Sequence, residues 1–169
     1  VWSSPFIITV VNVNDAPTIS GSPATTVAQD AAYNFVPTAA DVDADTTLTF
    51  SITNKPSWAM FNSATGALTG TPANSDVGVT NAIVISVSDG ELSASLPAFK
   101  LEVINVNEAP VANDDNYTLP MASDSIYILD VLLNDTDADE DTLSITAASS
   151  SVGQVTIVDN ALSFKPGDN

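Results

Sequence analysis

The chain has 169 residues, of which 44% are hydrophobic, and a formal net charge of −18 that results from 21 acidic residues against three lysines. Such an acidic chain excludes nucleic acid as a partner, because the phosphates would repel it, and it disfavours an anionic membrane face for the same reason. Cysteine and histidine are both absent, which excludes disulfides, thiolate chemistry, the usual zinc sites and any triad with a histidine base.

Apolar and β-branched residues alternate along most of the chain, and no stretch shows the 3.6-residue period of a helix. The strands predicted before residue 110 are 6–11, 31–37, 48–52, 82–88 and 99–104. Those predicted after it are 116–119, 125–133, 142–149, 153–159 and 161–166, with a hairpin turn at Asp159-Asn160. Short strands separated by turns predict an antiparallel β-sandwich.

One segment occurs twice: NVNDAP at residues 12–17 returns as NVNEAP at 105–110, and the preceding strands 6–11 and 99–104 also match. If residues 99–104 are the last strand of a domain, residues 6–11 are the last strand of an upstream domain. No basic segment precedes an apolar run at the amino terminus, so we interpret the chain as a segment of a longer protein. The predicted organisation is a terminal strand of an upstream repeat in 1–13, a complete domain in 14–107 and a partial second domain in 108–169 that lacks its last strands.

An acidic cluster follows each copy of the repeated segment. Alternate residues of an extended strand share a face, so alternating carboxylates repel one another unless a cation lies among them. Oxygen ligands without nitrogen or sulfur favour Ca²⁺, whereas Mg²⁺ demands a stricter octahedral geometry. An EF-hand is excluded by the spacing of Gly and Glu, and the alternative to a metal site is a solvated acidic loop. The alternating residues are Asp41, Asp43 and Asp45 in the first cluster and Asp135, Asp137, Asp139 and Asp141 in the second.

The stretches AADVDADTTLTFSI, FNSATGALTG, VISVSDG and LEVINVNEAP follow one another in the order and spacing of a cadherin repeat. The longer stretch PSWAMFNSATGALTGTPANSDVG resembles the bacterial dystroglycan-type cadherin-like domain. The part from APVANDDNYTL to ALSFKP is similar to the cadherin-like repeats of large bacterial calcium-dependent adhesins. Together these resemblances cover nearly the whole chain.

The resemblance implies an all-β fold of tandem Ig/cadherin-like antiparallel β-sandwiches joined by short linkers that bind Ca²⁺. Its pattern places Asp43 and Asp45 in the same role as Asp137 and Asp139, and Asp89 after the penultimate strand, although Asp89-Gly90 is also a good hairpin turn. Gln29 stands where a Glu is expected, which implies fewer or weaker ions per linker. The candidate metal ligands are Asn14, Asp15, Asp41, Asp43, Asp45, Asp89, Asn107, Glu108, Asp135, Asp137, Asp139 and Asp141.

These features predict an extracellular repeat module of a bacterial surface adhesin or filament, made rigid by Ca²⁺ and acting in cell adhesion. The expected partners are calcium ions and neighbouring repeats of the same protein. Homophilic or strand-donating contacts with a second copy are an alternative to the favoured interpretation, in which both ends of the chain are a simple boundary within a longer protein. We do not expect catalysis, because the acids cluster next to linkers and not in an aromatic-lined cleft. The alternative is a carbohydrate-binding module of a secreted polysaccharide-acting protein, with a glycan as its partner. In that case Trp58 could stack on a sugar, whereas we interpret it as a core or loop anchor.

Overall fold

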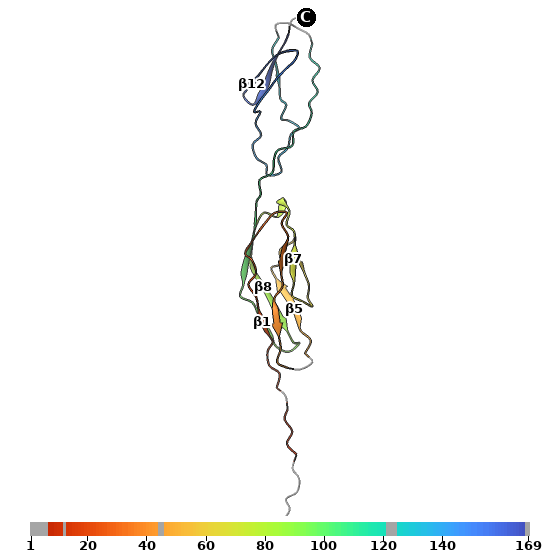
Figure 1. Ribbon diagram of the computed structural model, residues 1–169, viewed down its shortest axis with the longest axis vertical. Helices are drawn as coiled ribbons and strands as arrows, with labels where there is room; N and C mark the ends of the chain where they lie inside the picture. The colour runs from red at the N-terminus through yellow and green to blue at the C-terminus, as the bar shows by residue number, and fades with distance from the viewer. Residues whose placement is uncertain (1–6, 12, 44–45, 121–124, 168–169) are drawn as a thin grey trace, which may run out of the picture. The chain divides into compact units, whose positions relative to one another are not determined.

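The structure, a computed structural model, describes residues 7–11, 13–43, 46–120 and 125–167. It divides into two compact units, Val1–Val106 (unit 1) and Asn107–Asn169 (unit 2), which Figure 1 shows in ribbon form. Apart from one short 3-10 helix, η1 (Asn74–Asp76), the regular elements of the described residues are β-strands, which confirms the all-β prediction. None of the described helices could cross a membrane.

The strands of unit 1 are β1 (Thr18–Ser20), β2 (Thr26–Ala28), β3 (Tyr33–Phe35), β4 (Thr38–Ala40), β5 (Thr49–Thr53), β6 (Met60–Phe61), β7 (Leu68–Gly70), β8 (Gly78–Ser88), β9 (Ser93–Ser95) and β10 (Phe99–Ile104). Those of unit 2 are β11 (Tyr127–Leu129), β12 (Gly153–Val158) and β13 (Ala161–Pro166).

Unit 1 has a three-stranded sheet in the order β3-β7-β6, a five-stranded sheet in the order β2-β10-β8-β5 with β9 also paired to β8, and a two-stranded sheet of β1 and β4. The pairs are antiparallel except β2 and β10, which run parallel and so depart from the antiparallel prediction. β1 and β2 lie on one run of chain that crosses from the two-stranded sheet with β4 to the edge of the sheet that contains β10, and there β2 runs in the same direction as β10. Gly21, at φ +147°, lies in this crossing.

The core of unit 1 follows from two-residue periodicity. On β8, Ile83, Ile85 and Val87 alternate with outward residues and are fully buried. They belong to the same buried cluster as Leu101 of β10 and Leu68 of β7, so side chains of the five-stranded and the three-stranded sheet contribute to it. Burying each such side chain stabilises the fold by about 1.5–3 kcal/mol before the cost in conformational entropy.

Unit 2 contains one sheet in the order β11-β13-β12. The predicted hairpin between β12 and β13 is confirmed: its turn residues Asp159 (φ 49°) and Asn160 (φ 61°) both have positive φ, as a type I′ turn requires. Within residues 107–120 and 125–167 no side chain is fully buried, in contrast to unit 1. The sheet of unit 2 therefore has no core of its own in this part of the chain.

Three predicted strands are not observed as strands: 116–119, 142–149 and the described part of 6–11. A strand needs a neighbour for its backbone N–H and C=O groups. In unit 1, β2 and β5 occupy the positions that correspond to 116–119 and 142–149, and they pair with β10 and β8. The described part of unit 2 contains no counterpart of β8 or β10, so these two segments have no partner strand.

Candidate metal centres

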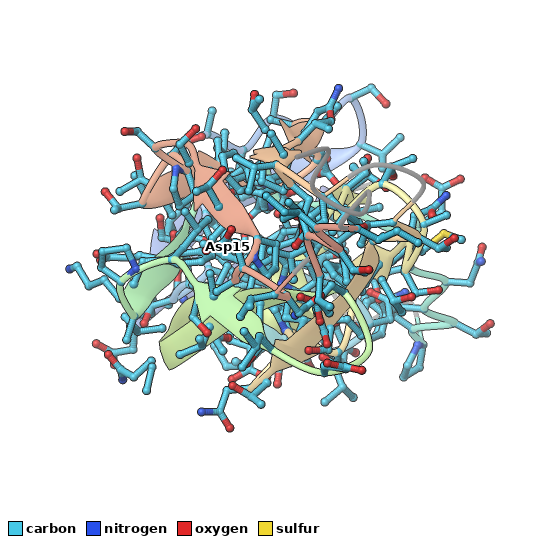
Figure 2. All side chains as sticks on the ribbon, turned by 90° about the horizontal axis from the view of Figure 1, so that it is seen from below. Asp15 is labelled. Atoms are coloured by element: carbon cyan, nitrogen blue, oxygen red, sulfur yellow. The ribbon has the colours of Figure 1, made fainter. Side chains whose placement is uncertain are left out.

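The first acidic cluster forms where three distant segments of unit 1 meet at the entry of the chain into the unit. The backbone N–H of Asp15, labelled in Figure 2, donates to Asp43 Oδ2 at 2.8 Å. The side-chain amide of Asn14 donates to Asp89 Oδ2 at 2.9 Å. The structure therefore brings the linker, the acidic loop after β4 and the turn after β8 together.

The loop after β4 has an Asx turn, in which the N–H of Asp43 donates to Asp41 Oδ1 at 2.8 Å. The second oxygen of that carboxylate, Asp41 Oδ2, is buried and has no hydrogen-bond partner in the part of the chain that the structure describes. A buried carboxylate oxygen without a donor is costly unless another positive group meets it. The chemistry of this oxygen fits a hard cation.

Asp89 is held by its own turn as well as by the linker. Its Oδ1 accepts from the N–H groups of Glu91 at 2.7 Å and Leu92 at 2.6 Å. The hydrogen bond from Leu92, followed by those from Asn14 and Glu91, lowers the pKa of Asp89 below its ordinary value. The turn role of Asp89 is thus observed, and its role as a metal ligand stays a prediction.

We expect Asp89→Asn to destabilise unit 1 near neutral pH and to have no effect in strong acid. A folded-state pKa lowered from 3.8 means that the stabilisation is fully present above that value and is lost as the pH falls through the lower folded pKa. Thermal melting in EDTA from about pH 6 to about pH 2 measures this, and the curves of wild type and variant should converge at the acid end. Asn14→Ala, which removes one donor and keeps the carboxylate, should show a smaller difference. Curves that stay parallel throughout would contradict the assignment.

The second cluster repeats the geometry of the first. The N–H of Glu108 donates to Asp139 Oδ2 at 2.7 Å, and the N–H of Asp139 donates to Asp137 Oδ1 at 2.9 Å. Carboxylate oxygens of Asp137, Asp139 and Asp141 all lie within 4.8 Å of one another. Asp139 Oδ1 is buried and has no hydrogen-bond partner among the described residues. The hydrogen bond observed for Asn107 does not connect it to these acids, because its side-chain amide donates to the carbonyl of Glu108 at 3.0 Å.

The repeated hydrogen bonds correct the register in which the two clusters were aligned. Asp41 and Asp43 hold the positions of Asp137 and Asp139, whereas the resemblance paired Asp43 and Asp45 with those residues. An alternating Asp pattern fits several registers equally well, and only the bond from the linker N–H selects one. Asp45 itself lies outside the described residues.

The hydrogen bond observed for Asp135 does not connect it to the other acids of the second cluster. Its Oδ1 accepts from the backbone N–H of Asn113 at 2.7 Å, and the side chain of Asn113 donates to the carbonyl of Asn134 at 2.8 Å. Asp135 therefore ties the segment after the linker to the acidic loop. The pattern of alternating Asp residues gave no sign of this role of Asn113 and Asn134, although each is followed directly by Asp.

Comparison with known proteins agrees with this architecture. Residues 16–104 match the family model described as "Putative Ig domain", which is more than half of the chain. The chain belongs to this Ig domain family. Residues 107–169 match the model described as "Bacterial Ig domain", so the chain consists of tandem Ig-like β-domains. No curated protein matches the chain.

Among solved structures, this Ig-domain chain is similar to an endo-fucoidan hydrolase from glycoside hydrolase family 107, with 26% identity, a TM-score of 0.42, and coverage of 90% of this chain and 24% of the other. A second structure of that type gives 24% identity, a TM-score of 0.43 and the same coverage. The human desmocollin-1 ectodomain gives 16% identity, a TM-score of 0.41, and coverage of 94% of this chain and 32% of the other. The chain thus spans about a quarter to a third of the length of these structures.

Trp58, the aromatic residue considered for sugar stacking, packs against the core of the first Ig domain. Its ring meets Tyr33 edge-on, with centroids 6.1 Å apart and an interplanar angle of 84°. A Cβ at Gly70 would lie 2.9 Å from the Trp58 ring, so a glycine is needed beneath the indole. These contacts confirm the interpretation of Trp58 as a core anchor.

One feature of both clusters could not be predicted from the sequence, namely the backbone amides of the linkers. Asp15 and Glu108 were singled out for their side chains, yet the observed link to the acidic loops is made by their N–H groups. No side-chain pattern signals such a bond. The proline two residues after each of these positions is the nearest sequence sign that the backbone has a defined path there.

Proposed function

We propose that this chain is a structural segment of an extracellular bacterial protein, in which Ca²⁺ binds beside each linker and stiffens it, and that the parent protein is a surface adhesin or filament. Tandem Ig-like domains are suited to extended spacers, and domains of these bacterial families are typically extracellular or on the cell surface. In this role the chain's partners are calcium ions and neighbouring repeats.

The observation that carries the proposal is the recurrence of one hydrogen-bonded arrangement at two sites. In each unit a linker N–H donates to an Asp of the acidic loop, at 2.8 Å for Asp15 and 2.7 Å for Glu108. A cation held by the same loop would fix the carboxylates and, through this bond, the backbone of the linker. Metal binding would then order the linker backbone, because it would remove the repulsion between the carboxylates of the metal-free chain.

The donor set suits Ca²⁺. The available ligands are oxygens, and Asp41 Oδ2 and Asp139 Oδ1 are buried carboxylate oxygens without a hydrogen-bond partner in the described chain. Three lysines in the whole chain cannot neutralise 21 acids. The observed salt bridge of Lys100 is to Glu102 on its own strand, at 3.2 Å. A divalent cation would relieve the like-charge repulsion inside each cluster.

Hydrogen exchange at the two linker amides tests the proposal directly. We expect the N–H groups of Asp15 and Glu108 to exchange about tenfold or more slowly in millimolar Ca²⁺ than in EDTA, because opening the bond would also require metal release. The N–H of Asp76, which donates to the carbonyl of Ala73 at 2.9 Å outside both clusters, is the matched control and should not change. Equal exchange of the linker amides with and without Ca²⁺ would refute calcium stiffening.

A further inference from the structure

The second copy of the repeated segment is bonded, within unit 1, by a side chain that carries no charge. Gln29, directly after β2, is only 3% exposed although its side chain is polar. A buried amide is costly unless it is hydrogen-bonded. Its Oε1 accepts from the backbone N–H of Val106 at 3.2 Å, across 77 positions of the chain. Val106 is the last residue of unit 1 and the second residue of NVNEAP, so Gln29 holds the start of the second linker.

This bond continues the ladder between β2 and β10. The N–H of Glu102 donates to the carbonyl of Thr25 at 3.0 Å, and the N–H of Gln29 donates to the carbonyl of Ile104 at 3.0 Å. Bonds of one kind recur every two residues in a parallel ladder, so the N–H of Val106 is in register with Gln29. The bond observed there goes to the side-chain oxygen of Gln29. One further rung beyond the two strands is thus supplied by a side chain.

The turn after β2 holds Gln29 in place. The N–H of Ala31 donates to the carbonyl of Ala28 at 3.2 Å, and Asp30 within this turn has a φ of +58°. The N–H of Asp30 donates to the carbonyl of Pro72 at 2.7 Å, and Pro72 is fully buried. A tight turn that is tied to the core restricts the backbone of Gln29, so its amide is preorganised as an acceptor.

The bond at Val106 differs in kind from the bond at Glu108. The N–H of Glu108 donates to a carboxylate of Asp139, which lies among other carboxylates of the second cluster. The carbonyl oxygen of a glutamine side chain accepts at any pH, and it needs no cation to offset a charge. Along the chain, Asn107 alone separates the two bonded residues.

We propose that Gln29 is a positioning residue that anchors the start of the second linker without metal, so that Ca²⁺ controls this linker only from Asn107 onward. In the metal-free chain Val106 stays fixed to unit 1, and the flexible segment begins after it. Fewer residues must then lose backbone freedom when the metal binds. The contrast with Glu108 rests on the proposed calcium function, whereas the anchor itself uses none of the acidic residues.

Hydrogen exchange in the full wild-type chain tests the anchor. In EDTA the N–H of Val106 should exchange about tenfold or more slowly than an unprotected amide, and millimolar Ca²⁺ should change its rate by less than about twofold. The N–H of Glu108, measured in the same spectra, reports on calcium binding. If Val106 is protected while Glu108 does not respond to Ca²⁺, the calcium function fails and the anchor is supported. A Val106 amide that is unprotected in EDTA overturns the anchor.

Gln29→Met removes the acceptor and keeps an unbranched side chain of similar length. We expect the N–H of Val106 to exchange about tenfold or more faster in this variant, in EDTA and in Ca²⁺ alike. The N–H of Glu102, which belongs to the same ladder, should keep its wild-type rate, because a merely structural role of Gln29 would accelerate both amides.

Asp30→Gly is the matched control for this variant. It changes the same turn and keeps the acceptor, and glycine adopts the positive φ of Asp30 without strain. The N–H of Val106 should therefore exchange in it as in wild type. Unchanged exchange at Val106 in Gln29→Met, or an equal acceleration at Glu102, would overturn the proposal.

Discussion

Millimolar Ca²⁺ should raise the melting temperature of the chain on the order of 10 °C relative to EDTA. A ligand at a hundred times its Kd stabilises the folded state by about 2.7 kcal/mol if the unfolded chain does not bind it. For a domain of this size, each kcal/mol shifts the melting temperature by roughly 4–8 °C. The unfolded chain cannot bring together the proposed ligands Asp15, Asp43 and Asp89, which are far apart in sequence.

Asp41→Asn distinguishes binding at a defined metal site from a general relief of charge repulsion. The Asn oxygen can still accept the bond from Asp43 N–H, so the loop keeps its turn. Without metal, the variant should be as stable as wild type or slightly more stable, because one like charge is gone. With Ca²⁺ it should lose most of the stabilisation. The matched control is Asp76, whose carboxylate accepts from Ala73 N–H away from the cluster. Asp76→Asn should keep the full response to Ca²⁺. Equal loss in the two variants would show that the response is nonspecific.

Leu68→Ala should destabilise unit 1 by about 2–5 kcal/mol, which is one of the largest effects available in this chain. Leu68 is completely buried in the core between the three-stranded and the five-stranded sheet, so truncation leaves a cavity as well as losing the transfer free energy of the side chain. With a total stability of about 5–15 kcal/mol for a typical domain, such a loss would bring unit 1 close to unfolding. Urea unfolding followed by NMR signals of each unit measures it separately from unit 2.

Leu162→Ala is the matched substitution in unit 2. Leu162 faces Leu129 as Leu68 faces Phe35, yet it is only half-buried, because the described part of unit 2 has no second sheet against it. We expect a cost below about 1 kcal/mol. A cost equal to that of Leu68→Ala would show that Leu162 is fully covered, and would contradict its half-buried position.

Much of the fold could be predicted from periodicity. The strands expected at 48–52, 82–88 and 99–104 correspond to β5, β8 and β10, and the expected hairpin corresponds to β12 and β13. Strands of two or three residues, such as β1, β4 and β6, were missed because so few residues cannot display an alternation. The parallel pairing of β2 with β10 could not be predicted either, because it depends on where the chain changes sheets.

The acidic clusters could also be predicted from the sequence only in part. Their residue types and their position after a repeated linker were evident in the sequence, and these favoured oxygen ligation. Their register was not evident, because three alternating carboxylates look alike until a backbone N–H selects one. Asp43 and Asp139 are equivalent only because the amides of Asp15 and Glu108 donate to them.

The sequence by itself determined the class of the fold, the two repeats and the chemistry of the acidic loops, because periodicity and residue type act locally. Tertiary structure decided which predicted segments became strands. The segments 116–119 and 142–149 have strand-like patterns as good as that of β5, but a strand exists only with a neighbour to accept its hydrogen bonds. Neighbouring strands are formed by residues far away in the chain, so the local sequence cannot predict them.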